Sequence, residues 1–512
     1  MMEGGNFVSG PLEVDVEGGV TSLPLSETQP SCGDILNNRL HQEKVCLDLV
    51  DWNGPDDPEN PQNFIVSKKW MITVLMSSMT MWVTFSSSVL SSGTVVMAQE
   101  FHVSTEVMTL ATSFVLCGFA IGPLVWGPLS ELYGRTIPLF VGYFTFIIFQ
   151  VPVAVARNIE TIMLCRFLGG LFGCAPLAVV GGAMADFWDP VDRGVAIAAF
   201  SAATFVGPLL GPIVGGFIVD SYLGWRWTAW ITMIAAGPFG VISLCLIPET
   251  YGRVILQRRA AHLRHTTQNW ALHSWLDQHK PSFGDVMQKY VSRPVKMLFL
   301  EPILLLFTFY LALVYGIMYL FLEAYPISFQ EIRGWKNGGV AALPFLSILV
   351  GVIIGALMII LNTRTRFARK LKEHGHVVPE ERLVPMMVAS ILLPIGLFWF
   401  GWTSKPSISW VPQAIAGVPI GIGILVIFMQ GINYLIDVYK MFANSAIAGN
   451  TLIRSGAGAA FPLFAVQMYH GLGVDWASSL LGFISVAMIP IPFLFFFFGP
   501  RIRAVSKFSA AL

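Results

Sequence analysis

Residues 200–217 read FSAATFVGPLLGPIVGGF, a strongly apolar stretch that nevertheless contains two prolines and four glycines. Gly207, Gly211 and Gly215 recur every four residues. Because successive residues of an α-helix are about 100° apart, these glycines form one narrow stripe. Such a stripe lets two membrane helices pack backbone to backbone, and prolines beside it bend the helix. The stretch therefore predicts a bent transmembrane helix that acts as a hinge or seal, with an ordinary tight helix contact as the alternative.

The composition of the whole chain indicates a membrane protein. Of its 512 residues, 54% are hydrophobic and 12% are charged, and the mean hydropathy is +0.66. Soluble domains are about 45–50% apolar and about 25% charged. Apolar runs such as 138–156, 229–247 and 302–322 approach the roughly 20 residues that a helix needs to cross a bilayer. The formal net charge of zero does not indicate a partner. The partners that we expect are a lipid bilayer and a small-molecule substrate, and we expect no binding to nucleic acid. We expect the protein to be monomeric.

Apolar runs fall into two groups of six around a longer polar segment. They cover residues 70–90, 107–126, 137–156, 161–184, 195–219, 228–248, 299–322, 340–361, 384–402, 409–435, 443–468 and 476–499. The expected fold class is therefore all-α integral membrane, with 12 transmembrane helices in two six-helix bundles, and the run at 409–435 is long enough for a tilted or kinked helix. The expected domains are a disordered cytoplasmic tail (1–69), an N-terminal bundle (70–248), a cytoplasmic central loop (249–298), a C-terminal bundle (299–499) and a cytoplasmic tail (500–512).

The distribution of lysine and arginine predicts which ends of the spans face the cytoplasm. Most of these residues outside the spans lie in the central loop, in the segment after the eighth span and in the other connections on the same side. Cytoplasmic loops carry an excess of Lys and Arg. We therefore expect both termini to be cytoplasmic, in agreement with the even number of spans. The charge distribution does not distinguish the cell membrane from the vacuolar membrane; the resemblance to a known family, carried by the motifs described below, implies the cell membrane, with the vacuolar membrane as the alternative.

Two six-helix bundles joined by a basic loop favour a secondary transporter. Such proteins bind substrate near the bilayer midplane between the halves and rock about it. The sequence contains no Walker-type ATP-binding loop and no metal-spaced histidine pair inside a span. We therefore expect no ATP drive, no bound metal and no enzyme active site. The alternatives are an importer or facilitator of a small organic solute, and a transporter-like sensor, which would normally need a long cytoplasmic tail.

Two motifs resemble signatures of a known transporter family. GPLLGPIVGG at 207–216 resembles the fifth-span signature of proton-coupled exporters in the major facilitator superfamily. GPLSELYGR at 127–135 resembles the cytoplasmic loop signature of the same superfamily, with Glu131 where many members have aspartate. In that family the bent fifth span is thought to seal the two halves against proton leak, so the resemblance implies proton-coupled export by alternating access, driven by a proton gradient and without a cofactor.

Three further stretches narrow the resemblance. DWNGPDDPENPQN at 51–63, PETYGRVIL at 248–256 and GPRIR at 499–503 are similar to motifs of the fungal branch of twelve-span drug:proton antiporters. That branch includes polyamine, drug and secondary-metabolite exporters. A proline that usually stands near Arg253 in the second of these motifs is absent here.

The resemblance also assigns roles to two groups of residues. The antiporter hinge consists of Gly207, Pro208, Gly211, Pro212, Gly215 and Gly216. In the loop signature, a tight turn with opposite charges four residues apart can hold neighbouring helix ends and release them when a proton or substrate shifts the balance. Asp186 and Arg193 are expected to bracket a further cytoplasmic turn. The expected cytoplasmic gate is therefore Gly127, Glu131, Gly134, Arg135, Asp186, Arg193 and Asp437.

Ionisable residues inside the spans are candidates for coupling, because each costs roughly 3 kcal/mol at the bilayer centre on insertion scales. Arg166 matches the fourth-span arginine of the family, which is taken to face the cavity; a structural arginine bonded to a helix end is the alternative. Arg454 is either a cavity cation or a residue that snorkels toward the cytoplasmic end. Glu323 is either a protonation site near the outer mouth or a solvated end residue. For Asp437 the simplest expectation is a pairing with Arg454 or Lys440.

Polar and aromatic residues of the spans are the remaining substrate-binding candidates. They are Trp82, Gln150, Tyr310, Tyr315, Tyr319, Gln430, Asn433 and Gln467. Aromatic residues of membrane proteins more often face lipid or pack than bind ligands. If several line one pocket, it would suit amphipathic, partly aromatic molecules. The two buried arginines, with few central carboxylates, favour neutral or anionic substrates over polyamines.

Overall fold

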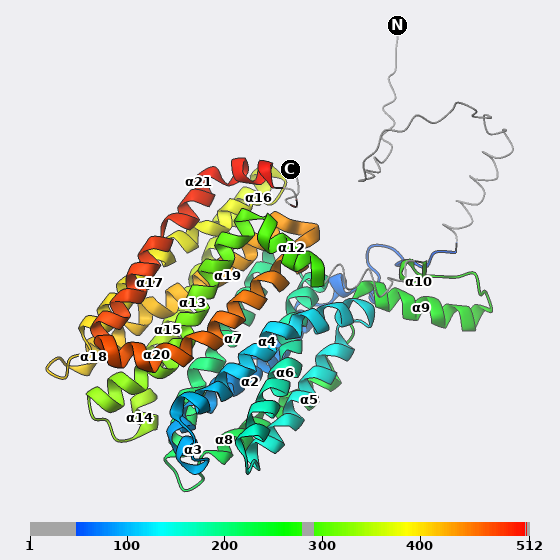
Figure 1. Ribbon diagram of the computed structural model, residues 1–512. Helices are drawn as coiled ribbons and strands as arrows, with labels where there is room; N and C mark the ends of the chain where they lie inside the picture. The colour runs from blue at the N-terminus through cyan, green and yellow to red at the C-terminus, as the bar shows by residue number, and fades with distance from the viewer. Residues whose placement is uncertain (1–47, 279–290, 507, 509–512) are drawn as a thin grey trace, which may run out of the picture. The chain divides into compact units, whose positions relative to one another are not determined.

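The computed structural model describes residues 48–278, 291–506 and 508. Residues 1–49 and 50–512 form two separate units, and only the second is described below. Every regular element in the described ranges is a helix (Figure 1). The predicted all-helical membrane fold is therefore confirmed, while the boundary predicted between the two bundles stays a prediction.

The first six predicted spans are long helices, coloured blue to green in Figure 1. They are α2 (Val66–Val89), α4 (Thr105–Leu132), α5 (Thr136–Ala154), α6 (Ile159–Phe187), α7 (Pro190–Val219) and α8 (Arg226–Leu246). Short helices η1 (Pro61–Asn63), η2 (Ser91–Gly93) and α3 (Thr94–Glu100) lie beside α2 in the sequence. Within this N-terminal half, α4 and α5 pack on α6, and α7 packs on α2.

The rest of the chain forms the central loop and the C-terminal half. The described helices of the loop are α9 (Gly252–Thr267), α10 (Trp275–Gln278) and α12 (Arg293–Leu300). The helices that follow are α13 (Pro302–Pro326), η4 (Ile327–Ile332), α14 (Gly338–Ala342), α15 (Phe345–Asn362), η5 (Thr363–Phe367), α16 (Ala368–His374), η6 (Pro379–Arg382), α17 (Leu383–Trp402), α18 (Trp410–Ile415), α19 (Gly417–Tyr439), η7 (Lys440–Phe442), α20 (Ala443–Met488) and α21 (Pro490–Val505). The run at 409–435, which the sequence predicted to be tilted or kinked, is broken between α18 and α19.

The last two predicted spans are joined without a loop. Eleven stretches of the described chain are long and apolar enough to cross a membrane, and the last of them, Ala443–Ala504, has 62 residues and contains both predicted spans. Inside α20, Gly473 has φ +78° and ψ 159°, which interrupts the helix between those spans. Glycine is suited to this position because a side chain is strained at positive φ. Eleven stretches are thus compatible with the twelve predicted spans.

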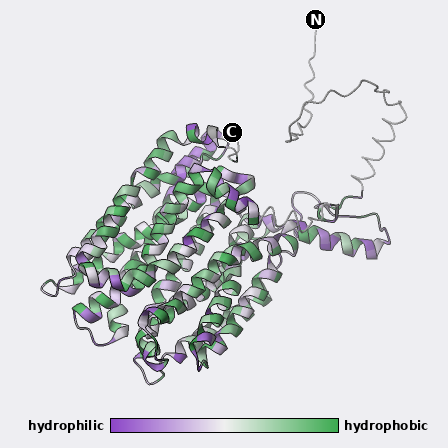
Figure 2. Cartoon of the chain, viewed as in Figure 1, coloured by the Kyte–Doolittle hydropathy of each residue, from purple (hydrophilic) through white to green (hydrophobic). Residues whose placement is uncertain are grey.

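The two halves pack on each other through helices of both. Helix α4 contacts α20, and α7 contacts α14, α15 and α19. One hydrophobic core cluster runs from Ile72 in the N-terminal half to Phe495 in the C-terminal half. Figure 2 shows hydrophobic residues along the lengths of the long helices, with hydrophilic residues prominent in α9. We name the two ends of the bundle by a residue in a turn at each: the Arg135 end, after α4, and the Asp220 end, after α7.

The segment before α2 is folded onto the central loop from residue 50. The Asp57 carboxylate accepts hydrogen bonds from the backbone amides of Asn53 and Glu59 and from Nη1 of Arg259 on α9, at 2.8, 3.0 and 2.7 Å. The bond from Arg259 and those from the amides lower the pKa of Asp57 to about 2. The predicted disordered tail is therefore wrong for residues 50–65, because side-chain bonds order a stretch of polar composition. Residues 1–47 of that tail lie outside the described residues.

Candidate functional site

The glycine stripe of α7 lies directly on α2. A Cβ atom at Gly207 would overlap Thr84 and the backbone of Met81, and one at Gly211 would overlap the hydroxyl of Ser88. A Cβ at Gly215 would likewise meet the carbonyl of Val89, so α2 and α7 touch along the stripe. The close helix contact expected from the sequence is present, and its role as a hinge stays a prediction.

Gly216 faces the opposite half of the protein. A Cβ there would lie 2.7 Å from the amide nitrogen of Gly339 and 2.8 Å from the carbonyl carbon of Gly338, both on α14. Beside this contact, the amide of Gly338 donates to Asp220 Oδ2 at 2.5 Å. Helix α7 is therefore in backbone contact with both halves at the Asp220 end.

At the Arg135 end, the turn between α4 and α5 holds the end of α6. Arg135 Nε donates to Asp186 Oδ2 at 2.9 Å, and Nη1 donates to the Ser130 hydroxyl at 3.0 Å. Glu249 accepts from the Arg135 amide at 2.8 Å and from the Thr136 hydroxyl at 2.8 Å, so it caps the start of α5. The sequence motif contained Glu249, but nothing in the sequence marked it as part of the gate.

Gly134 and Glu131 complete this turn. Gly134 has φ +89°, and a Cβ there would overlap the Glu249 carboxylate. Glu131 Oε1 accepts from Nδ2 of Asn444 at the start of α20, at 2.7 Å. The two opposite charges of the motif therefore hold two neighbouring helix ends: Arg135 holds α6 of its own half, and Glu131 holds α20 of the other half. Gly127 lies within α4, and its carbonyl accepts from Ser130 at 2.9 Å.

A similar set of ion pairs lies in the C-terminal half. Arg382, before α17, donates to Asp437 near the end of α19 at 3.0 Å, and both side chains are buried. Glu380 pairs with Arg503 of α21 at 2.9 Å. The first pair joins the loop after the second span of its half to the end of the fourth span, as Arg135–Asp186 does. The predicted pairing of Asp437 with Arg454 or Lys440 is wrong, because Arg382 comes to it from a loop that the sequence did not place nearby.

Arg193 lies in the first turn of α7 and reaches the C-terminal half. It flanks the turn after α6 together with Asp186, but the two residues have different partners: Asp186 pairs with Arg135, while Arg193 is within electrostatic range of Asp437 and Arg382. One residue further on, a Cβ at Gly194 would lie 2.9 Å from the Thr363 methyl group. The halves therefore touch at the Arg135 end as well as at the Asp220 end.

Arg166 is bonded to the end of a helix. Its side chain donates from Nη1 to the Ser86 carbonyl at 2.6 Å, from Nη2 to the Ser87 carbonyl at 3.1 Å, and from Nε to the Ala111 carbonyl at 3.1 Å. Ser86 and Ser87 lie in the last turn of α2, where carbonyls lack helical partners and the helix dipole is negative. Arg166 forms no ion pair with the described residues. This geometry is that of the structural alternative; a role in coupling stays a prediction.

A hydrogen bond between the halves lies directly beside Arg166. The hydroxyls of Ser87 on α2 and Tyr319 on α13 are 2.9 Å apart. The Ser86 hydroxyl donates to Gln150 Oε1 at 3.4 Å. Two predicted substrate-binding residues, Gln150 and Tyr319, are therefore joined to Arg166 through serines that the sequence analysis missed. Three consecutive serines at 86–88 in an apolar span were the available signal.

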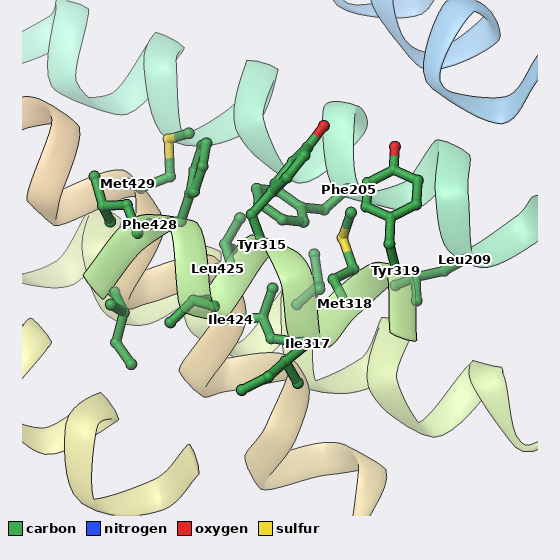
Figure 3. Close-up of a cluster of buried hydrophobic side chains, with 14 of the residues drawn as sticks. Phe205, Leu209, Tyr315, Ile317, Met318, Tyr319, Ile424, Leu425, Phe428 and Met429 are labelled. Atoms are coloured by element: carbon green, nitrogen blue, oxygen red, sulfur yellow. The ribbon is translucent and has the colours of Figure 1, made fainter. Parts of the chain in front are cut away.

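Arg454 lies against two aromatic rings. Its guanidinium carbon is 5.0 Å from the ring centroid of Tyr315 on α13 and 4.7 Å from that of Phe428 on α19. Those rings are 5.9 Å apart and inclined by 25°, and Phe205 of α7 lies edge-on to Phe428 at 5.1 Å. Figure 3 shows these rings together, with the hydroxyls of Tyr315 and Tyr319 directed the same way from α13. We call Tyr315, Phe428 and Arg454 the aromatic cradle.

Several buried polar atoms of helices α19 and α20 have no hydrogen-bond partner within the described chain. Among them are both amide atoms of Gln430, Oδ1 of Asn450, the hydroxyl of Ser455 and Nε of Arg454. In folded proteins such groups are almost always bonded, so these exceptions indicate positions where a ligand or water can bind. Helices α19 and α20, which carry these residues, also carry Phe428 and Arg454 of the cradle.

The other predicted residues are dispersed. Trp82 packs against Phe85 and Phe239 inside the N-terminal half, 5.4 and 6.0 Å between ring centroids. Gln467 bonds Glu106 across the halves at 3.4 Å. Glu323 is half-buried on α13 and within electrostatic range of Glu331, which pairs with His470 at 2.7 Å. Tyr310 and Asn433 are buried in the C-terminal half, on α13 and α19.

The chain is similar to a known family over most of its length. A family model described as Major Facilitator Superfamily matches residues 71–462. A citrinin biosynthesis cluster MFS transporter of Monascus ruber is 61% identical over 502 residues, which cover 98% of this chain and 99% of the relative. An ascochitine biosynthesis cluster MFS transporter of Didymella fabae is 58% identical over 469 residues (92% and 91%), and a cercosporin MFS transporter of Cercospora nicotianae is 46% identical over 466 residues (91% and 90%).

Proposed function

Since the chain belongs to the Major Facilitator Superfamily, we propose that it is a proton-coupled antiporter that exports a secondary metabolite by alternating access. Its multi-pass membrane character and its role in transport follow from the family and the apolar helices. The proton coupling, the outward direction, the cell membrane as location, a monomeric state and a cytoplasmic Arg135 end are parts of the proposal.

The names of the relatives support a secondary metabolite as substrate. Three of them are named for citrinin, ascochitine and cercosporin, and the first two for the biosynthesis clusters of those compounds. These relatives match at least 90% of this chain, so the likeness includes both halves. A compound made by the same cell needs a route out, which favours export over import.

The observation that carries the mechanism is that the halves touch at three levels. Glu131 bonds Asn444 at the Arg135 end, Ser87 in the last turn of α2 bonds Tyr319, and Asp220 bonds Gly338 at the Asp220 end. This is a closed arrangement, and transport requires each end to open in turn while the other stays closed. Single hydrogen bonds suit this use, because each contributes only about 1 kcal/mol net and is readily broken.

Glu323 is the proposed proton carrier. Among the described residues it forms no ion pair or hydrogen bond, unlike Asp186 and Asp437, which are held by arginines. A carboxyl group without a fixed cation can gain and lose a proton without breaking a structural contact. We propose that no cofactor takes part and that the proton gradient is the energy source.

An efflux assay tests the proposal. Pump-deficient yeast expressing the full chain would be loaded with a panel of drugs, polyamines, organic acids and aromatic polyketide-like compounds, with and without a protonophore. We expect efflux of at least one aromatic compound, and its loss with the protonophore and in Glu323→Gln. The matched control is Glu160→Gln, an exposed carboxyl at the start of α6.

Three outcomes of this assay would contradict parts of the proposal. An efflux rate that is unchanged by the protonophore would contradict proton coupling and indicate a facilitator. Net uptake would contradict the direction and indicate an importer. Transport of no compound by a protein that reaches the membrane would favour a sensor.

A further inference from the structure

The two arginines inside the bundle differ in what their donors bind. Arg166 uses Nε, Nη1 and Nη2 on three backbone carbonyls, so its bonding capacity is largely used within the protein. Arg454 makes one long bond of 3.5 Å, to Thr451 of its own helix, and its buried Nε has no partner within the described chain. Arg454 therefore retains donors for a group that the protein does not supply.

The positive charge of Arg454 is also not matched by a carboxylate. Among the described residues it forms no ion pair, and two carboxylates near the ends of spans are engaged elsewhere, Asp186 with Arg135 and Asp437 with Arg382. Glu323 is eight residues beyond Tyr315 on α13, about 12 Å along the helix. A buried cation is stable only when paired or hydrogen-bonded, so this position favours an anion.

The surroundings of Arg454 favour a flat, conjugated molecule. Tyr315 and Phe428 are stacked on each other, and a further planar π system can extend such a stack. Gly458 makes room for this arrangement, because a Cβ there would lie 2.8 Å from the ring of Tyr315. The unpartnered amide of Gln430 offers a donor and an acceptor for oxygen substituents. Asn450 offers only its Oδ1 as an acceptor, because its Nδ2 donates to Thr308 at 3.2 Å.

We propose that the aromatic cradle is the substrate subsite for a planar aromatic anion, in which Arg454 binds the acidic oxygen of a carboxylate conjugated with the ring. This rests on the proposed function as an exporter. In this assignment Arg454 selects the charge of the substrate and the rings select its planarity. Arg166 positions the end of α2 and does not touch the substrate.

Binding to the purified full chain in lipid nanodiscs tests the subsite directly. The probes are 2-naphthoate, its methyl ester and 2-naphthylmethylammonium, which share the ring system and differ in charge. We expect 2-naphthoate to bind at least about tenfold more tightly than either of the others, as a charge-assisted bond implies. Equal binding of the three probes, tighter binding of the ammonium compound, or no saturable binding of 2-naphthoate would overturn the proposal.

Variants then assign the selectivity to Arg454. Arg454→Gln is expected to reduce the preference for 2-naphthoate to within about twofold of the ester, and Arg454→Lys to keep part of it. The control is Arg369→Gln, which removes an exposed arginine on α16. An unchanged preference in Arg454→Gln would overturn the assignment. If Arg454→Gln does not fold, binding of the three probes to the unaltered protein and to Arg454→Lys still tests whether Arg454 causes the preference for 2-naphthoate.

The same probes separate this inference from the proposed function. Efflux of the ester or the amine without any preference for the acid would leave export intact and refute the aromatic anion as substrate class. Selective binding of 2-naphthoate without efflux of any compound in cells would support the subsite and refute export.

Discussion

Arg166 shows how a buried charge can be satisfied by backbone alone. Its position in the fourth span was predicted from the sequence, but its partners were not. The carbonyls of Ser86 and Ala111 are 80 and 55 residues away in the chain, and a carbonyl carries no side-chain signal. The same limit applies to Asp437, whose partner Arg382 is 55 residues away. The sequence identifies the charged residues of a site, and only the packing of helices decides what each one binds.

Removing Arg166 should destabilise the protein more than it changes the substrate preference. In Arg166→Leu the carbonyls of Ser86, Ser87 and Ala111 lose their donor, and each buried unsatisfied group costs about 1–3 kcal/mol. We expect a loss of about 3 kcal/mol in the free energy of unfolding, measured by thermal unfolding of the purified protein in detergent. Arg157→Leu, at an exposed arginine, should change it by less than about 0.5 kcal/mol. Equal effects of Arg166→Leu and Arg157→Leu on the free energy of unfolding would show that the bonds from Arg166 to the carbonyls do not stabilise the protein.

The bond between Ser87 and Tyr319 should act as a unit in transport. Tyr319→Phe and Ser87→Ala each remove one hydroxyl and leave the Ser87 carbonyl on Arg166 in place. Because either change breaks the same bond, the double variant should lose little more initial efflux rate than one single variant, with a coupling of about 1 kcal/mol. The measurement is a double-mutant cycle on efflux. Strictly additive effects would mean that the two hydroxyls act independently.

The long helices could be predicted closely because each apolar run is bounded by polar residues. The departures have identifiable physical causes. Helix α13 continues through η4 to Ile332, and α20 runs past its predicted end until Gly473 interrupts it. Residues 50–65 were assigned to a disordered tail by composition, yet Asp57 alone accepts from two amides and from Arg259. Composition measures how much apolar surface a segment can bury, and it does not detect order that arises from side-chain to backbone bonds.

The stripe on α7 should tolerate no added methyl group. In Gly211→Ala the new Cβ would overlap Ser88 and come within 2.9 Å of the Val89 amide nitrogen, and backbone cannot move aside cheaply. We expect the free energy of unfolding to fall by about 2 kcal/mol, as in other overpacked cores. The measurement is the melting temperature of the protein purified in detergent, which should fall accordingly. Gly237→Ala in α8, where a Cβ meets nothing within 4 Å, should be neutral or stabilising by about 0.5 kcal/mol. A neutral Gly211→Ala would mean that α2 and α7 are not in backbone contact.

The segment that carries Asp57 should loosen at low pH. Its pKa in the folded protein is about 2, below the ordinary value of 3.8, so its stabilising effect is complete above that ordinary value and is lost as the pH falls toward 2. In Asp57→Asn the bond to Arg259 loses its charge, and hydrogen exchange of amides in residues 50–65 at neutral pH should become faster. Asp56→Asn, at the exposed neighbour, should leave exchange unchanged. Equal amide exchange rates of residues 50–65 in Asp57→Asn and Asp56→Asn would contradict this prediction.

As a whole, the protein is held closed by contacts at both ends, and these can be weakened separately. Asn444→Ala removes the bond to Glu131 at the Arg135 end, and Asp220→Asn weakens the bond to Gly338 at the Asp220 end. Distances between spin labels placed across each end should lengthen at the Arg135 end in the first variant and at the Asp220 end in the second. Opening at both ends in either variant would contradict alternating access, because it would create a leak.

The twelve-span fold follows from apolar runs, and the family from motifs, but the closed arrangement of the halves could not be predicted. It depends on contacts such as Glu131–Asn444 and Asp220–Gly338, between residues more than 100 positions apart. The predicted site residues fall into two groups. Tyr315, Tyr319, Gln150 and Arg454 lie close to the interface of the halves, whereas Trp82 packs inside one half; their binding of substrate stays a prediction.

The paired bonds Arg135–Asp186 and Arg382–Asp437 have a consequence for how the two halves can be compared with each other. Each joins the loop after the second span of its half to the end of the fourth, although the residues around them show no clear repeat. In each half one cation and one anion at these places hold the loop, although the surrounding residues differ. A superposition of the two halves that is guided by these ion pairs would therefore match each loop and helix of one half with its counterpart in the other, although a sequence alignment of the halves shows no clear repeat.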